Sequence, residues 1–509
     1  MRTRVVKGTM NISSDGDIEF HTFGGDLTFR AGGKNEWTSP QTVVGAYEPI
    51  DVEDFPPENE KTCKFLVHFR RPDDYRGEFG FDWMRDNYKD ICNDYENLKK
   101  EYYDAEKKNE KVEINEQEYF VPWLSMFPNQ EVKLALELEL IEGKINNKDI
   151  ISISSVEGVN FAQNEIKLKD IKKKKDKGEE FLVTISCSGS LEKDICVNVF
   201  YKNNKLVGKL NIVKNNIRYY LPVTIINITN NGLDSNIVSD SEIQKIFNTE
   251  SFQQALIETE VNVNSLNISQ EDLLSKGVIS VLIDKDGTER IVANEETLDT
   301  LVEISANNNK KSNIGVNLFI FEFSRAHFRK YKPNNFDYVS FDVYEEEKVD
   351  RNGILFKQYR YICEYSPERQ LENNDENLFV IIEGQVGESR VIPTRQNSCI
   401  VYKGYDKKMS TVHEIAHLLG LSEIFQSSLN EKRYNYYKQK QTLTPKEEEY
   451  VTDYENMSKY RSFFFKRNHT DNFMDYYEPI SNSKSPIKIS FYHWQWAIMQ
   501  YEVNNYIKK

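Results

Sequence analysis

Residues 409–421 of the C-terminal half of the chain read MSTVHEIAHLLGL. The apolar residues of this stretch recur at helical spacing, no proline interrupts them, and Gly420 is placed to end the segment. The stretch therefore predicts a buried helix. A short apolar segment at 398–402 precedes it and predicts a buried strand.

Two histidines lie on one face of this predicted helix. His413 and His417 are four residues apart, so their imidazoles leave the helix one turn apart. Only 7 of the 509 residues are histidine, and about 0.1 such pairs are expected by chance. Buried imidazoles need polar partners, and one Zn²⁺ at roughly 2.0–2.1 Å from both nitrogens serves both. The competing interpretation, two core histidines with ordinary hydrogen bonds, needs a separate partner for each.

Glu414 follows the first histidine and is rotated about 100° from it around the helix. Its carboxylate is therefore poorly placed to bind the same ion and well placed to touch a water molecule next to it. A general base needs this position. The sequence predicts Glu414 as the catalytic base of a hydrolytic reaction.

The pattern continues beyond the helix to Glu423, Met474 and Tyr476. Here the chain resembles the metzincin clan of zinc peptidases, which carry HExxHxxGxxH or HExxHxxGxxD and a later methionine turn beneath the metal. The resemblance implies a peptidase domain in which His413, His417 and Glu423 bind zinc and Tyr476 helps to bind the oxyanion. Glu423 departs from the family pattern, which has histidine or aspartate at that place.

Two other sets of residues compete with Glu423 for the third ligand position. His469 stands shortly before the methionine turn and offers a nitrogen ligand. Glu449 and Asp453 form an ExxxD pattern that resembles the gluzincin clan, in which the glutamate is the third ligand. An acidic first helical turn, favoured by the helix dipole, is the simpler explanation of Glu449. The methionine turn favours the metzincin arrangement.

The chain is acidic, with 81 Asp and Glu against 66 Lys and Arg and a formal net charge of -15. Phosphate binding needs a basic face, so nucleic acid is not expected as a partner. The only sizeable basic run, 172–175, is expected to be a solvated loop. Neither a membrane span nor a classical signal peptide is expected, because no apolar stretch has the required length or position.

A length of 509 residues predicts two or three domains, and the changing pattern along the chain favours a multidomain α+β protein. Alternation of period two predicts a β-sandwich of immunoglobulin-like type, with a hairpin turn at Asn203 and Asn204. The predicted domains are a small β module at 1–57, a strand plus helical connector at 58–115, the β-sandwich at 116–230, and an α/β zinc metallopeptidase domain at 231–509.

The first half of the chain, residues 1–230, is similar to bacterial effectors of contractile injection systems such as type VI secretion. The segments that carry this similarity are VKGTM at 6–10, YRGEFGFDWMR at 75–85 and YFVPWLSMFPN at 119–129. Such segments look like carriers that precede diverse toxic domains. The resemblance implies spike or tube proteins and an immunity protein as partners. It also implies a bacterial cytoplasmic location before secretion or injection into a target cell.

The residues and resemblances together predict a zinc-dependent endopeptidase, a toxin or effector acting on a protein or peptide substrate, with Glu414 as base. The substrate is expected to pair with an edge strand just before the helix, for which Cys399–Tyr402 is the candidate. Two alternatives stay open. One is a catalytically inactive zinc-binding module, in which Glu423 marks decay of the ligand set. The other is a structural or carrier component of the injection apparatus.

Overall fold

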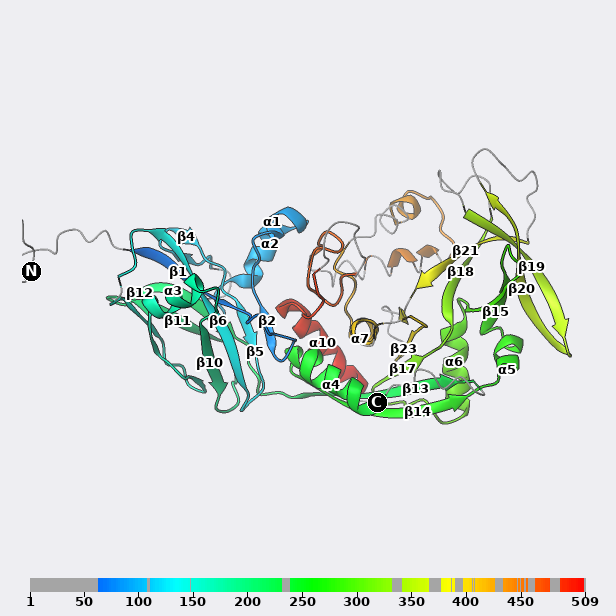
Figure 1. The fold of residues 1–509 in the computed structure, drawn as a ribbon, viewed down its shortest axis with the longest axis horizontal. Helices are drawn as coiled ribbons and strands as arrows, with labels where there is room; N and C mark the ends of the chain where they lie inside the picture. Colours follow the sequence, from blue (N-terminus) through cyan, green and yellow to red (C-terminus); the bar gives the residue numbers. More distant parts are fainter. Residues whose placement is uncertain are drawn as a thin grey trace, which may run out of the picture. The chain divides into compact units, whose positions relative to one another are not determined.

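The computed structural model describes most of the chain beyond residue 62. The described residues are 63–107, 110–146, 148–230, 239–331, 341–365, 377–385, 387–389, 397–404, 406, 408–425, 434–445, 447–448, 450–452, 455, 463–476 and 486–507. The chain divides into two units, Met1–Glu60 and Lys61–Lys509, and all of these residues belong to the second. The β module predicted at 1–57 lies outside the described residues. The second unit is a multidomain α+β structure built mostly of strands (Figure 1).

Two packed sheets form the first part of this unit. Their strand orders are β1-β6-β10-β8 and β2-β5-β12-β11-β7-β9. Alternation along β6 buries Leu134, Leu136 and Leu138 in a shared core and leaves its charged residues outside. Asn203 and Asn204 both have positive φ, 55° and 57°, which confirms the hairpin turn predicted between β11 and β12. The strands are β1 (Lys64–Arg70), β2 (Gly80–Asp82), β5 (Trp123–Ser125), β6 (Glu131–Glu142), β7 (Ile150–Ile153), β8 (Val159–Phe161), β9 (Glu165–Lys167), β10 (Leu182–Cys187), β11 (Ile195–Tyr201) and β12 (Lys205–Ile212).

Short elements surround these sheets. They are α1 (Tyr88–Ile91), α2 (Tyr95–Leu98), the 3-10 helix η2 (Lys99–Tyr102), the strand pair β3 (Glu113–Ile114) and β4 (Gln117–Glu118), and α3 (Leu168–Asp176). The lysine run at 172–175, predicted as a loop, lies in α3. Leu168 and Ile171 anchor one face of this helix in the core, while the lysines stay exposed.

The second part is built on a five-stranded sheet with the order β14-β13-β17-β23-β22. Four strands run parallel: β13 (Tyr219–Thr229), β14 (Ile257–Asn267), β17 (Val316–Ile320) and β23 (Ser398–Val401). The fifth, β22 (Gly387–Ser389), pairs antiparallel with β23. β13 falls within the range predicted for the sandwich but pairs with β14 and β17. Its run of buried residues is the pattern of a strand inside a parallel sheet.

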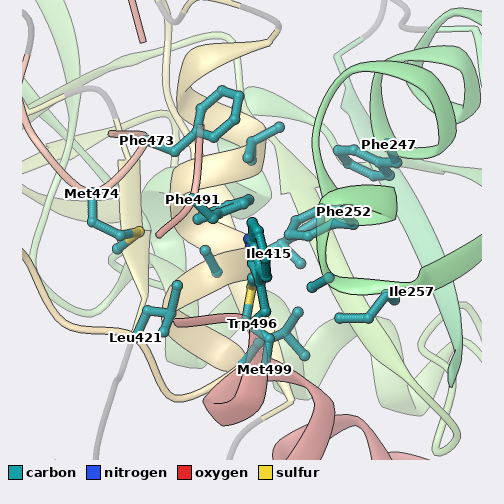
Figure 2. Close-up of a cluster of buried hydrophobic side chains, with 14 of the residues drawn as sticks. Phe247, Phe252, Ile257, Ile415, Leu421, Phe473, Met474, Phe491, Trp496 and Met499 are labelled. Atoms are coloured by element: carbon teal, nitrogen blue, oxygen red, sulfur yellow. The ribbon is translucent and has the colours of Figure 1, made fainter. Parts of the chain in front are cut away.

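Helices cover both faces of this sheet (Figure 1). On one face lie α4 (Asp240–Glu250), the 3-10 helix η3 (Phe252–Ala255), α7 (Met409–Leu418) and α10 (His493–Ile507); on the other lie α5 (Gln270–Ser275) and α6 (Thr297–Asn307). Figure 2 shows Ile415 of α7 in one apolar cluster with Phe473, Phe491 and Trp496. This cluster fixes α7 against the sheet. Among the described helices, none combines the length and the apolar character needed to cross a membrane.

A closed six-stranded barrel interrupts the second part, with the order β15-β16-β18-β21-β19-β20. Its strands are β15 (Ile279–Ile283), β16 (Glu289–Ala293), β18 (Ser324–Lys330), β19 (Phe341–Arg351), β20 (Ile354–Tyr365) and β21 (Leu378–Gln385). Leu282, Tyr344 and Tyr359 lie in its core. The chain leaves the barrel after β16 to form α6 and β17, and leaves it again after β21 to form β22.

The edge of the five-stranded sheet corrects one prediction. Cys399–Tyr402 is not an edge strand, because β23 lies between β17 and β22 and pairs with both. The outermost described strand on that side is β22. It is only three residues long, which is too short to show a period in the sequence.

Candidate metal centre

The helix α7 forms where the sequence predicts it, at Met409–Leu418. At its start, the Asp406 carboxylate accepts a hydrogen bond from the main-chain N–H of Met409 at 2.5 Å. At its end, Gly420 adopts a φ of +84°. The N–H of Gly420 donates to the carbonyl of His417 at 3.0 Å, and that of Leu421 to Ala416 at 3.1 Å. This pair of bonds is a Schellman motif, which turns the chain sharply after the histidines.

The two predicted histidines meet as expected. His413 Nε2 and His417 Nε2 are 3.0 Å apart, and both rings are buried. His413 Nδ1 lies 2.8 Å from the carbonyl oxygen of Phe473, and His417 Nδ1 lies 2.7 Å from that of Leu421. A ring that donates from Nδ1 to a carbonyl presents Nε2 as a ligand atom. Two nitrogens on one tetrahedral Zn²⁺ are roughly 3.3 Å apart, so a small opening of the pair suffices.

Glu423 is the third member of the cluster. Its Oε1 lies 3.6 Å from His417 Nε2, and one ligand atom from each of His413, His417 and Glu423 lies within 4.8 Å of the others. The turn at Gly420 brings the chain back, and the N–H of Ile424 donates to the carbonyl of Met474 at 3.2 Å. Two imidazoles and one carboxylate form a donor set that suits Zn²⁺ and leaves a fourth position open.

The rival ligands do not join this group within the described part of the chain. His469 Nδ1 lies 2.7 Å from the carbonyl oxygen of Arg467, two residues away, and His469 is not in the cluster. Glu449 and Asp453 lie outside the described residues. The described geometry therefore favours Glu423 over His469.

His417 and Glu423 form a charge pair in this cluster, and His413 stays neutral. Burial, together with His417, lowers the pKa of His413 to about 4. Burial also opposes charge on His417, but the Glu423 carboxylate outweighs it and raises the pKa of His417 to about 9. Burial raises the pKa of the Glu423 carboxyl, but the attraction of His417 is stronger and holds that pKa well below its usual range. A neutral imidazole therefore lies beside a positive charge that a carboxylate balances.

Glu414 lies apart from the three ligand atoms and is buried. Burial raises the pKa of its carboxyl to about 7, which suits a group that takes and returns a proton near neutral pH. Its neighbour is Gly387 of β22, where a Cβ atom would lie 2.3 Å from Glu414 Oε1. The carboxylate therefore packs directly against the edge strand.

Tyr476 lies beside the cluster and is 38% exposed. Its hydroxyl donates to Glu423 Oε1 at 3.2 Å, and its ring centroid is 5.8 Å from that of His413. Burial of the hydroxyl, with Glu423 nearby, raises the pKa of Tyr476 well above its usual value. The hydroxyl therefore keeps its proton and can donate a hydrogen bond. Met474 is fully buried in the cluster of Figure 2.

Several residues around the site carry no signal in the sequence. Gly387 and Glu388 lie in β22, and Glu388 Oε2 accepts hydrogen bonds from Tyr402 at 2.9 Å and from Arg325 at 3.3 Å. Arg325 belongs to the barrel strand β18 and is buried. These contacts join the barrel to the edge strand. Distant pairing brings the residues together, so no spacing in the sequence reveals them.

The sequence matches no known protein-family model and no curated protein. The candidate site therefore depends on the geometry of His413, Glu414, His417, Glu423 and Tyr476.

Proposed function

We propose that the chain is a zinc-dependent endopeptidase. The observation that carries this proposal is the convergence of His413, His417 and Glu423, with ligand atoms within 4.8 Å of one another. Beside them stands Glu414, buried and with a pKa of about 7. Two imidazoles, a carboxylate ligand and a separate carboxylate base are the parts that zinc-assisted peptide hydrolysis requires.

The side chains have distinct roles in the proposed reaction. When bound, Zn²⁺ supplies Lewis acidity, which polarises a carbonyl group and makes water more acidic. Glu414 accepts a proton from the attacking water and later delivers it to the nitrogen of the leaving amine. The hydroxyl of Tyr476 turns from Glu423 to donate a hydrogen bond to the oxyanion that develops on the substrate carbonyl.

The edge strand β22 is the proposed support for the substrate. β22 pairs with β23 and is the last described strand on that side of the sheet. An extended peptide can add to such an edge by main-chain hydrogen bonds. Because Gly387 lies against Glu414, a peptide on this edge passes next to the proposed base.

The finer identity of the domains is part of this proposal. We assign the five-stranded sheet and its helices to a metzincin-like peptidase domain, with Met474 as the methionine turn. The two packed sheets before it are assigned to an immunoglobulin-like sandwich. The similarity of residues 1–230 to injection-system effectors supports delivery as a toxin, with spike or tube proteins and an immunity protein as partners. The proposed route is export from the bacterial cytoplasm.

Glu414→Gln tests the proposal directly. The substitution keeps the shape of the side chain but removes the base, so zinc content is expected to stay near one ion per chain while cleavage of unfolded casein is lost. The matched control is Glu303→Gln, at an exposed position on α6 across the sheet from α7. It should leave both quantities unchanged. A Glu414→Gln protein that cleaves casein at the wild-type rate would remove Glu414 from its role, and a wild-type protein without zinc would refute the metal centre.

A further inference from the structure

One atom of the candidate site comes from the main chain of a loop. The carbonyl oxygen of Phe473 accepts the hydrogen bond from His413 Nδ1 at 2.8 Å. This bond selects Nε2 as the ligand atom and sets the orientation of the ring. The N–H of Phe473 in turn donates to the carbonyl of Ser490 at 2.9 Å. The position of this loop therefore decides how His413 faces a metal.

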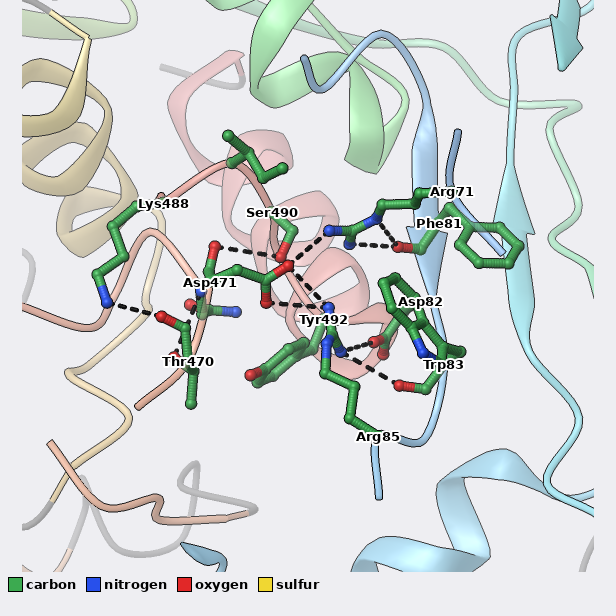
Figure 3. Close-up of polar contacts among 12 residues, drawn as sticks. Arg71, Phe81, Asp82, Trp83, Arg85, Thr470, Asp471, Lys488, Ser490 and Tyr492 are labelled. Carbon is green, nitrogen blue, oxygen red and sulfur yellow. Dashed lines mark hydrogen bonds and ion pairs between the residues drawn. The ribbon is translucent and has the colours of Figure 1, made fainter. Parts of the chain in front are cut away.

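Asp471, two residues before Phe473, is held by two arginines from the first part of the unit. Arg71 Nη1 donates to Asp471 Oδ2 at 2.6 Å, and Arg85 Nη2 donates to both carboxylate oxygens at 2.9 Å (Figure 3). The side chains of Arg71, Arg85 and Asp471 are 6%, 15% and 17% exposed. Charge-assisted hydrogen bonds of this geometry are strong and directional, especially away from water.

Other contacts also hold the guanidinium groups of the two arginines in place. Arg71 Nε donates to the carbonyl of Phe81 at 3.0 Å, and Arg85 Nη1 donates to that of Trp83 at 3.1 Å. Both guanidinium groups also lie over the Trp83 ring, at 4.8 and 4.0 Å from its centroid. The segment 71–85, which contains β2, therefore presents a rigid pair of cations (Figure 3).

The anchored carboxylate is connected to the carbonyl that contacts His413. The main-chain oxygen of Asp471 accepts hydrogen bonds from the N–H groups of Ile489 at 2.9 Å and Ser490 at 3.2 Å. Ser490 then accepts the bond from Phe473 described above. Asp471 and Phe473 are thus successive contacts of one short hydrogen-bond ladder.

Close main-chain contacts join the same two parts nearby. A Cβ atom at Gly77 would lie 2.3 Å from the carbonyl oxygen of Glu250, and one at Gly80 would lie 2.4 Å from that of Gln254. Asp82 Oδ2 accepts a hydrogen bond from the N–H of His493, the first residue of α10, at 3.0 Å. The segment 71–85 is therefore docked on the peptidase part at several points.

We infer that Arg71 and Arg85 are positioning residues of the metal centre, which act on His413 through Asp471 and the carbonyl of Phe473. The segment 71–85 is then a working part of the site and not a detachable carrier. This inference rests on the proposed metal centre, but it concerns zinc affinity and does not require peptide cleavage.

Zinc affinity of full-length variants tests the inference. Asp471→Asn keeps the size of the side chain and removes its charge, and Arg85→Ala removes the two-pronged contact. For both, the zinc dissociation constant, measured by chelator competition on folded protein, is expected to rise about tenfold or more. Arg85→Lys should restore part of the affinity, because a lysine supplies the charge but lacks the second nitrogen that Arg85 donates to Trp83. The matched control is Arg351→Ala, which removes the exposed ion pair with Glu289 in the barrel.

A second readout separates orientation from simple loss of stability. Replacement of zinc by Co²⁺ gives visible absorption bands that depend on ligand geometry, and these bands should change in Asp471→Asn but not in Arg351→Ala. Asp471→Asn and Arg85→Ala proteins that fold and keep wild-type affinity and spectrum would overturn the inference alone. A wild-type protein that binds zinc tightly but cleaves no peptide would overturn only the proposed peptidase activity. A wild-type protein that binds no zinc would overturn both.

Discussion

Gly387→Ala is predicted to remove most of the catalytic activity while leaving zinc binding intact. A Cβ atom at this position would lie 2.3 Å from Glu414 Oε1 and 2.7 Å from its Cδ and Cγ. Ordinary van der Waals contact begins at 3.4 Å, so the carboxylate must retreat by 3.4 − 2.3, about 1 Å. The atoms that must move are the end of a flexible side chain, so the helix itself can stay in place.

A displacement of about 1 Å at a catalytic group lowers the rate roughly 100-fold, equivalent to about 2.7 kcal/mol in the activation free energy. The three atoms nearest to the new methyl group all belong to Glu414, and none belongs to His413 or His417. Zinc affinity is therefore expected to stay within about twofold of wild type, and the melting temperature should change little.

The assay is kcat/KM on a fluorogenic peptide, measured beside the zinc dissociation constant and the melting temperature. Gly189→Ala is the matched control, because a Cβ atom there meets no atom within 4 Å. Wild-type turnover in a folded, zinc-loaded Gly387→Ala protein would refute the placement of Glu414 or its role as base. Loss of zinc would refute the separation of Glu414 from the ligands.

Three further predictions concern Asp471, His417 and Tyr476. The pKa of Asp471 is about 2, because its two arginines outweigh burial, so its ion pairs stabilise the fold above pH about 4 and lose effect as pH falls through 2. Asp471→Asn should lower the free energy of unfolding at pH 7 by about 2 kcal/mol, with a smaller loss at pH 3, measured by urea denaturation; equal losses at both pH values would contradict this. Because His417 has a pKa of about 9, zinc uptake at pH 7 should release at least about one proton per chain, seen by calorimetry in buffers of different ionisation enthalpy. Uptake without proton release would argue against His417 as a ligand. Tyr476→Phe should lower kcat roughly 100-fold, and an unchanged kcat would remove Tyr476 from oxyanion binding.

The part of the site that the sequence predicted is the part encoded over a few consecutive residues. His413, Glu414 and His417 share one helix, whose period sets their directions before any tertiary contact forms. Gly420 then turns the chain by its positive φ, and this turn returns Glu423 to the histidines. The Asn203-Asn204 hairpin was predictable for the same local reason.

The other residues of the site are brought together by contacts between distant segments. Such contacts produce no regular spacing in the sequence from which they could be predicted. Gly387 lies beside Glu414 because the chain passes from the barrel strand β21 to β22 at the edge of the five-stranded sheet. Arg85 contacts Asp471 across 386 positions of sequence. The sequence places β13 in the sandwich, although the strand pairs with β14. Its residues would be apolar in a sandwich or in a parallel sheet, so only the pairing shows to which domain the strand belongs.

We expect His413, His417 and Glu423 to bind one ion, with Glu414 beside it. Anomalous diffraction at the zinc edge, from crystals of the full-length protein loaded with zinc, locates such an ion. One peak is expected, about 2.0–2.2 Å from His413 Nε2, His417 Nε2 and a carboxylate oxygen of Glu423. A peak bound elsewhere, or no peak from a protein with both histidines in place, would contradict the account.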